Sequence, residues 1–371
     1  MGGWFNYNIF TIKSMLDFDY NILQCPIKKE NLKYLPKEHT IEFLKGYNND
    51  LINVDEISEG FINESHSYFY PVFNGIILLL PIYAFPINSD GNDMAHMSFD
   101  KDRVFRYYNE INYISKNSYK IYEDSKKWVD FREVSEDYIK SSFCKAKRYL
   151  NASGKYLLDI ASGPIGLTEY INLSENFEYR ICADISVNAL IQAKQNYKHR
   201  KGIYICADIT NIPLKDNCCD SVLCQHTLYH VPKSEQKTAV NEMYRVAKPS
   251  SRIVIIYSLF YHSWFMNLSL FPVQVYRILR HFAGKFYVRL FNKKPRLYFY
   301  PHSLRWFKKS FKFSDKIEIY CWRSTNKYFL NLYIHKFFGG KQLLNILKRS
   351  EEKHSTIWGR LGEYPLIQIT K

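Results

Sequence analysis

The sequence predicts an α/β protein with a doubly wound, mostly parallel sheet of seven strands. Short apolar runs alternate with helical segments through the middle of the chain, and strands that alternate with helices in this way form parallel sheets. Two further apolar runs near the C-terminus supply the last two strands. The predicted strands are residues 156–160, 179–184, 203–208, 221–225, 252–257, 316–320 and 364–369.

Two regions precede this sheet. In the first, Asn74-Gly75 separates the apolar runs 68–73 and 76–80, a pattern typical of a β-hairpin. In the second, apolar residues recur three and four positions apart, which favours helices. The predicted division is a small β-rich module over 1–95, a helical connector or lid over 96–150, and the sheet domain over 151–371 with a helical insertion at 260–315 in the C-terminal third.

The net charge of +15 is concentrated in the last third of the chain. Residues 260–371 contain 21 Lys and Arg against 5 Asp and Glu. Such a concentration of cations predicts contact with an anion, for example substrate phosphate, nucleic acid or lipid headgroups. We expect Lys293, Lys294, Arg296 and Arg305 to border the mouth of the ligand crevice.

Neither a membrane span nor a targeting segment is predicted. No apolar run reaches the roughly 18 residues that a transmembrane helix needs, and residues 1–6 have no charged or apolar signal-peptide region. The eight cysteines include no Cys-x-x-Cys pair, so their spacing predicts neither a disulfide framework nor a metal site. We expect a cytoplasmic protein, and the sequence does not indicate its oligomeric state.

Three of the predicted strands end in an acid, namely Asp159, Asp184 and Asp208. Ligands of parallel sheets bind at the carboxyl ends of the strands, so we expect the three carboxylates to line one crevice and to accept hydrogen bonds from a nucleoside. A single acid in such a position more often caps the next helix, but the repetition favours a ligand. The loop 161–166, Ala-Ser-Gly-Pro-Ile-Gly, has small residues that let a ligand approach the backbone.

Two nucleoside ligands fit this pattern. Ala161-x-Gly163-x-x-Gly166 approximates the dinucleotide fingerprint, in which Asp184 would hold an NAD ribose. The run Leu157–Gly163 instead resembles the first motif of class I methyltransferases, in which an acid precedes a glycine-rich loop, although Ile165 stands where many members have a third glycine. Residues 183–186, 207–209, 212–216, 219–222 and 245–249 resemble that family's later motifs, in the family's order.

The resemblance implies a Rossmann-like methyltransferase fold and S-adenosylmethionine as the cofactor. Because the sulfonium is already a strong electrophile, in-line positioning supplies most of the acceleration, and a general base is needed only where the acceptor must lose a proton. The implied residues are Asp159, Ala161, Ser162 and Gly163 at the methionine part, Asp184 with Ile185 at the ribose, Asp208 and Ile209 at the adenine, Gln225 near the sulfonium, and His226 and His230 as candidate catalytic bases.

The N-terminal segment resembles a second family, the small zinc-ribbon domain that accompanies or activates methyltransferases. The runs Leu23–Pro26 and Tyr70–Ile76 are similar to it. Cys25 matches a metal-binding cysteine of that family, but Lys28 stands where its second cysteine would be. Because a zinc site needs about four ligands, we expect a degenerate ribbon without metal.

The sequence therefore predicts a methyltransferase that acts on an unidentified, anionic small-molecule or lipid-linked acceptor. The alternatives are a non-catalytic cofactor-binding scaffold and a nucleic-acid methyltransferase, which the basic last third favours. An Asn-Pro-Pro-Tyr-like tetrapeptide and known RNA-binding motifs are both absent from the sequence, which argues against nucleic acid. The insertion from Tyr261 to Phe291 is expected to form a helical lid over the acceptor pocket, or else an amphipathic surface for an anionic membrane.

Overall fold

The computed structural model describes residues 18–45, 52–87, 97–116, 119–291 and 297–371. Lys293, Lys294 and Arg296, which we expected at the mouth of the crevice, lie outside these ranges. Among the helices that are described, none is both long and apolar enough to cross a membrane.

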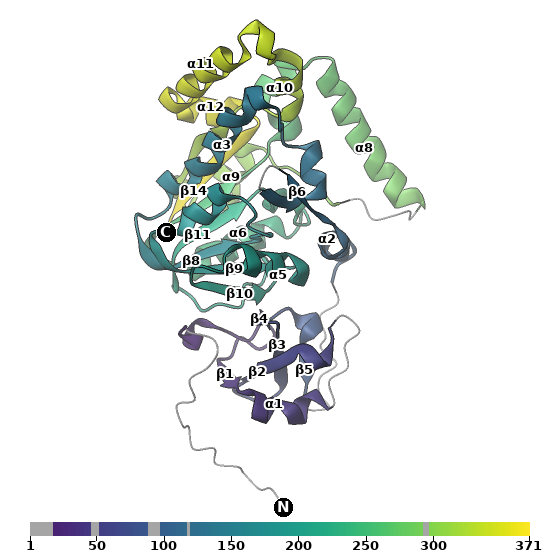
Figure 1. Cartoon of the computed structure of the whole chain (residues 1–371), viewed down its shortest axis with the longest axis vertical. Coiled ribbons are helices and arrows are strands. Elements are labelled where there is room, and N and C mark those ends of the chain that lie inside the picture. Colours follow the sequence, from purple (N-terminus) through teal and green to yellow (C-terminus); the bar gives the residue numbers. More distant parts are fainter. Residues whose placement is uncertain (1–17, 46–51, 88–96, 117–118, 292–296) are drawn as a thin grey trace, which may run out of the picture.

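A single mixed sheet of twelve strands runs through the molecule (Figure 1). Its doubly wound part has the order β10-β9-β8-β11-β12-β14-β13. The first five of these strands are parallel, and β14 runs antiparallel to both β12 and β13. The bounds are β8 Gly154–Ile160, β9 Phe177–Asp184, β10 Gly202–Cys206, β11 Cys219–Gln225, β12 Ala247–Ile256, β13 Ile317–Arg323 and β14 Tyr364–Thr370. The predicted α/β class and the seven predicted strands are confirmed.

Apolar side chains cover both faces of these strands, as a sheet with helices on each side requires. In β8, Leu158 belongs to the core that includes α6 (Gln236–Val246), and Leu157 belongs to the core that includes α3 (Glu136–Cys144). The helix α5 (Val187–Asn196) packs on β9 and β10. At the other end of the sheet, α11 (Gly340–Lys353) and α12 (Ser355–Leu361) pack on β13.

The N-terminal module extends the sheet, which therefore has more than the seven strands predicted. Its hairpin turns at Asn74 and Gly75 with φ of 52° and 72°, a left-handed conformation that these two residues adopt readily. The second hairpin strand then pairs in parallel with β10, with Ile77 opposite Ile205. The strands are β1 Leu32–Leu35, β2 Ile57–Asn63, β3 Tyr68–Phe73, β4 Ile76–Leu78 and β5 Phe85–Pro86, and α1 spans Lys37–Leu44.

The connector is only partly helical. The helix α2 (Phe99–Glu110) is followed by a hairpin of β6 (Tyr113–Lys116) and β7 (Tyr119–Tyr122). The expectation of helices throughout this region is wrong for the hairpin. A few apolar residues three and four apart cannot distinguish a helical turn from a short strand rich in tyrosine and isoleucine.

The C-terminal insertion is helical, as predicted. It contains α7 (Trp264–Ser269), the long helix α8 (Val273–Phe291) and α9 (Leu304–Ser310), and α10 (Lys327–Tyr333) follows β13. In Figure 1, α8 lies along one side of the molecule with one of its ends projecting from the body.

We expect the β4–β10 junction to make the module and the sheet unfold as one unit. Ile77 is fully buried, so Ile77→Ala should lower the free energy of unfolding by about 2–5 kcal/mol. Ile41 on α1 is 49% exposed, and Ile41→Ala should change stability by less than about 0.5 kcal/mol. Urea denaturation followed by circular dichroism and by tryptophan fluorescence measures this. Two separate transitions, with only the first shifted, would contradict it.

Candidate functional site

A cavity of about 2000 Å³ opens at the carboxyl edge of the parallel strands. Its wall combines the loops after β8, β9 and β11 with the β6–β7 hairpin, with α8, and with the ends of β13 and β14. Pockets for one small ligand usually measure about 300–1,000 Å³. This cavity therefore has room for two ligands side by side.

The glycine-containing loop after β8 forms one side of the cavity. The backbone curls through left-handed conformations at Ala161, Gly163 and Ile165, with φ of 57°, 60° and 46°. A β-branched residue rarely adopts such a φ, but the Ile165 side chain is 1% exposed and packs in the core beside α5. This packing stabilises Ile165 in a left-handed backbone conformation that a glycine would adopt without strain. Ser162 lies in the same loop and also faces the cavity.

Asp184 connects this loop to the end of β9. One carboxylate oxygen accepts a hydrogen bond from the Gly163 N–H at 2.9 Å, and the other accepts one from the Ser186 N–H at 2.9 Å. Burial raises the pKa of Asp184 to about 6, although the two backbone donors oppose the shift. Asp184 and its neighbour Ile185 both line the cavity, as we expected.

Asp159 does not line the cavity, which corrects our expectation for this acid. It lies within β8, and its carboxylate accepts hydrogen bonds from the Arg180 guanidinium of β9, at 3.1 Å from Nε. Both side chains are buried, with relative exposures of at most 1%. The diagonal position of the two residues on one face of the sheet turns Asp159 toward Arg180, so its role in the structure is to neutralise that cation.

Asp208 is also separated from the cavity, and the same correction applies to Ile209. The strand β10 ends at Cys206, so Asp208 falls in the following turn. There it accepts a hydrogen bond from Lys101 of α2 at 2.6 Å, and Lys101 also pairs with Glu235 at 2.5 Å. The ion pair between Lys101 and Asp208 thus attaches α2 to the turn that follows β10. The expectation that three acids line one crevice holds for Asp184 only.

The end of β11 contributes Gln225 and His226 to the cavity wall. The Gln225 Oε1 atom is buried, and no group of the described residues donates a hydrogen bond to it. His226 has a φ of 56°, and its ring packs edge-on against Trp322 at 4.5 Å between centroids. Burial, together with the nearby Arg323 and a second histidine, lowers the pKa of His226 to about 3.

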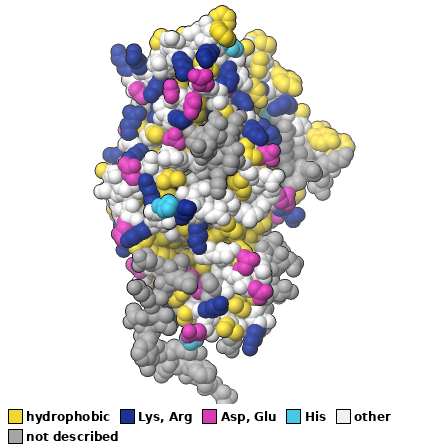
Figure 2. Space-filling view, viewed as in Figure 1, with side chains coloured by type: hydrophobic (Ala, Val, Ile, Leu, Met, Phe, Trp, Pro, Cys, Tyr) yellow, Lys and Arg dark blue, Asp and Glu magenta, His cyan; other side chains and the backbone are white. Residues whose placement is uncertain are grey.

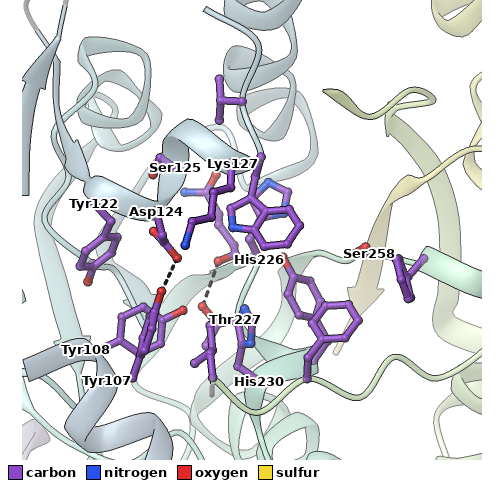
Figure 3. Close-up of a pocket in the computed structure, with 18 of the residues that line it drawn as sticks. Tyr107, Tyr108, Tyr122, Asp124, Ser125, Lys127, His226, Thr227, His230 and Ser258 are labelled. Carbon is purple, nitrogen blue, oxygen red and sulfur yellow. Dashed lines mark hydrogen bonds between the residues drawn. The ribbon is translucent and has the colours of Figure 1, made fainter. Parts of the chain in front are cut away.

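His230 also lines the cavity, and its orientation is defined by one hydrogen bond. Its Nδ1 lies 2.7 Å from the Tyr298 carbonyl oxygen. A carbonyl can only accept, so Nδ1 carries the proton and Nε2 keeps its lone pair. Burial lowers the pKa of His230 to about 4, and the ring is therefore neutral at pH 7. Figure 3 shows His230 beside Thr227 and below His226.

Tyrosines from α2 and the β6–β7 hairpin form a wall that we did not predict (Figure 3). Tyr107 donates a hydrogen bond to Asp124 at 2.8 Å. The Tyr122 ring lies over the glycine loop, where a Cβ added to Gly163 would be 3.4 Å from it. The density of tyrosine between residues 107 and 122 was the available signal in the sequence.

The wall on the side of α8 and the last two strands contains two buried cations and one acid. Arg277 of α8 and Arg323 at the end of β13 are 8% and 3% exposed, and Glu363 precedes β14. Glu363 accepts hydrogen bonds from the Ser258 hydroxyl at 3.2 Å and from Asn326 at 3.3 Å.

Of the two arginines, Arg323 has a buried donor without an acceptor. Arg277 donates to Gln274 at 2.6 Å and lies over the Tyr328 ring. Arg323 donates from Nε to the Thr325 carbonyl at 3.1 Å, while its Nη1 is buried with no acceptor among the described residues. Both guanidinium groups lie close enough to the Glu363 carboxylate to interact with its charge.

These cations were missed because they are far apart in the sequence. The sequence contained only a weak signal for them, which is that Arg323 follows the predicted strand 316–320 and Glu363 precedes the predicted strand 364–369. Arg305, which we had expected at the mouth of the crevice, is exposed on α9 and does not line the cavity. The basic last third does reach the cavity, but through different residues, namely Arg277, Arg280, Lys285, Arg289, Arg323 and Lys327.

Cys25, the candidate zinc ligand, lies in the N-terminal module away from the cavity. Its Sγ accepts a hydrogen bond from the Lys28 backbone N–H at 3.3 Å and is 3.1 Å from the Tyr70 hydroxyl. In the part of the chain that the structure describes, no group of three or more His, Cys, Asp or Glu residues is arranged to hold a metal ion. The resemblance to a zinc ribbon, and the absence of metal from it, stay predictions.

Comparison with known proteins identifies the region around the cavity. Residues 158–255 match the family model described as a methyltransferase domain. An uncharacterized protein of Methanocaldococcus jannaschii is 34% identical over 110 residues, which are 30% of this chain and 44% of that protein. A demethylmenaquinone methyltransferase of Corynebacterium urealyticum is 34% identical over 104 residues, 28% of this chain and 42% of the enzyme. The chain thus spans less than half the length of these curated relatives.

Among solved structures, a SAM-dependent methyltransferase from Archaeoglobus fulgidus is 16% identical, with a TM-score of 0.40. The match covers 64% of this chain and 95% of that one. Together with the strand order and the motifs, the family match shows that this chain carries a class I methyltransferase domain. The cofactor of this domain is S-adenosylmethionine, so the dinucleotide alternative is set aside.

We expect the Asp159 carboxylate to stabilise the folded protein. Asp159→Asn leaves the buried Arg180 charge without its counter-ion, which should lower the free energy of unfolding by about 3–5 kcal/mol. The control is Glu175→Gln in the exposed pair with Lys147, for which the loss should be under about 1 kcal/mol. Chemical denaturation measures both. If Asp159→Asn were stable but no longer bound S-adenosylhomocysteine, Asp159 would have to be assigned to the cofactor site.

Proposed function

We propose that the protein is an S-adenosylmethionine-dependent methyltransferase whose acceptor is an anionic small molecule or an anionic lipid-linked molecule. The observation that carries this proposal is the composition of the cavity. One end has the glycine loop and Asp184, and the other has the buried cations Arg277 and Arg323. A cavity of about 2000 Å³ accommodates a cofactor at the first end and an acceptor at the second.

At the cofactor end, the residues present fit a nucleoside with an amino-acid tail. The Asp184 carboxylate is held in place by two backbone donors and can accept further hydrogen bonds from ribose hydroxyls. The unpartnered Gln225 Oε1 is an acceptor for an ammonium or hydroxyl group. The bound cofactor supplies an electrophilic methyl group, and the task of the protein is to align an acceptor with it.

At the acceptor end, the argument concerns charge. A buried guanidinium is costly unless it is paired. Arg277 and Arg323 both lie near Glu363, whose carboxylate is also bound by Ser258 and Asn326, and the buried Arg323 Nη1 atom has no acceptor among the described residues. An anionic group of the acceptor would complete the pairing. The aromatic rings of Trp322 and Tyr364 beside Arg323 provide a surface for an apolar or aromatic body attached to that group.

His230 is our preferred general base. The group is neutral near pH 7 because burial lowers its pKa to about 4. Its Nδ1–H is held by the Tyr298 carbonyl, so Nε2 is the atom that can accept a proton from an acceptor hydroxyl. His226, with a pKa lowered to about 3 and its ring packed against Trp322, is a weaker base, and we assign it a positioning role.

Cofactor affinity should depend on the ionisation of Asp184. Burial raises its pKa to about 6, so the carboxylate is ionised at pH 8. The affinity for the cofactor should fall as the pH drops through 6, because the Asp184 carboxylate is then protonated and loses its charge. Asp184→Asn should weaken binding by about 1–3 kcal/mol at pH 8 and should remove the step near pH 6. Calorimetry with S-adenosylhomocysteine measures both effects.

The control is Asp55→Asn, since Asp55 is exposed in the N-terminal module. This variant should keep both the affinity and the pH profile of the parent. His226 and His230 titrate well below pH 6, so they do not produce the same step. An unchanged dissociation constant in Asp184→Asn would show that the ribose is held elsewhere.

Methyl transfer itself is tested with labelled S-adenosylmethionine and a panel of carboxylates, phenolates and extracted lipids. We expect label in an anionic acceptor. Arg323→Gln should then raise the KM for this acceptor by the equivalent of about 1.5–3 kcal/mol, the value of a hydrogen bond to a charged group. The affinity for S-adenosylhomocysteine should stay the same, and Arg305→Gln should change neither quantity because Arg305 is outside the cavity.

Three results would contradict the proposal. Label that appears only in neutral acceptors, with no effect of Arg323→Gln, would exclude the anionic subsite. Tight binding of the cofactor without transfer to any acceptor would favour the scaffold alternative instead. A loss of S-adenosylhomocysteine affinity in Arg323→Gln would assign Arg323 to the carboxylate of the cofactor.

A further inference from the structure

The helix α8 has its apolar side chains directed outward. The residues that are least exposed recur on one side, at Gln274, Arg277 and His281, and this side includes cavity-lining residues. On the opposite side, apolar residues recur every three or four positions, which makes a continuous stripe along the helix. We name this stripe the outer face of α8, and it consists of Val275, Tyr276, Leu279, Phe282, Phe286 and Leu290.

The exposure of the outer face is large for a folded protein. Leu279 is 63% exposed and Phe286 is 67% exposed. Contiguous exposed apolar side chains of this kind usually mark a surface that contacts a partner or a membrane. Figure 2 shows apolar side chains gathered on the same side of the molecule on which Figure 1 places α8.

The neighbouring helix α7 extends this apolar surface. Trp264, Leu268 and Phe271, in α7 and the turn that leads into α8, are 75%, 83% and 71% exposed. Because α7 packs directly against α8, these side chains and the outer face of α8 belong to one region of the surface. A tryptophan at such a position suits the boundary between water and lipid, where its ring is apolar and its N–H can reach water.

The charges on α8 indicate which occupant covers this surface. The helix contains four cations and no Asp or Glu, and two of these cations, Arg280 and Arg289, are exposed to solvent. A second copy of the chain, packed helix on helix, would bring two sets of cations together. A surface of anionic phospholipid complements them, since each Lys or Arg close to such a surface contributes about 1 kcal/mol of attraction.

We propose that α7 and α8 bind an anionic membrane surface, with the outer face of α8 in the headgroup region and the exposed Arg280 and Arg289 at the phosphates. An amphipathic helix that lies in the interface in this way buries its apolar face by about 5–10 Å. The inner side of the same helix lines the cavity, so binding places the cavity next to the lipid. This docking does not depend on the chemistry proposed for the cavity.

The test is co-sedimentation of the full chain with vesicles of phosphatidylcholine, with and without phosphatidylglycerol. We expect binding to the vesicles that contain phosphatidylglycerol and at least tenfold weaker binding to the neutral ones. The triple variant Leu279→Gln, Phe282→Gln, Phe286→Gln should reduce the binding at least tenfold, because the transfer of apolar side chains out of water is lost. Its melting temperature should equal that of the parent, since the three side chains are exposed.

The matched control is a second triple variant, Leu343→Gln, Ile346→Gln, Ile357→Gln. These residues lie on α11 and α12 and are 49%, 64% and 54% exposed, so the variant removes similar apolar area from another surface. It should bind the anionic vesicles as the parent does.

Four outcomes would overturn the proposal. The first is no sedimentation with anionic vesicles, and the second is equal loss of binding in both triple variants. The third comes from light scattering without lipid: a dimer that the α8 triple variant dissociates would show that a second copy covers the outer face. Equal binding to neutral and anionic vesicles would reject the role of the cations on α8.

Discussion

The parallel hydrogen-bond ladder from β10 through β9, β8 and β11 to β12 is the constraint on which the rest of the structure depends. Parallel pairing brings the carboxyl ends of these strands to one edge, so the loops that follow them must share one cavity. The hydrogen bond from the Gly163 N–H to Asp184 then joins two of these loops directly. The glycine loop, Gln225 and His230 are far apart in the sequence, and this strand pairing brings them into the wall of one cavity.

Buried charge separates the residues that support the fold from those that await a ligand. Asp159 forms an ion pair with Arg180 inside the sheet, and Asp208 forms one with Lys101. Neither acid lines the cavity, although the Oδ1 atom of Asp159 is buried without a hydrogen-bond donor among the described residues. Arg323 differs because it lines the cavity, and its buried Nη1 atom has no acceptor among the described residues. A protein keeps such an incompletely paired cation where a function requires it, since burying it costs free energy that a ligand can later recover.

The helix α8 joins the cavity to the molecular surface. Its inner side carries Arg277 into the wall of the cavity, while its outer face presents apolar side chains to solvent. A helix that only covers a core has the opposite arrangement, with apolar side chains inward and charges outward. The inverted pattern is understandable if charge is needed in the cavity and apolar area is needed at an interface. The two proposals for this protein therefore concern opposite sides of one element.

The sequence by itself determined the elements and their order. Alternating apolar runs predicted the seven strands, and Asn74-Gly75 predicted a hairpin, because these signals are local and depend on the period of the backbone. The tertiary structure decided which residues meet. It added the N-terminal strands to the sheet through Ile77, turned Asp159 away from the cavity, and brought Arg323 to the wall. Strand pairing and side-chain direction depend on contacts between residues far apart in the chain, and no local pattern encodes them.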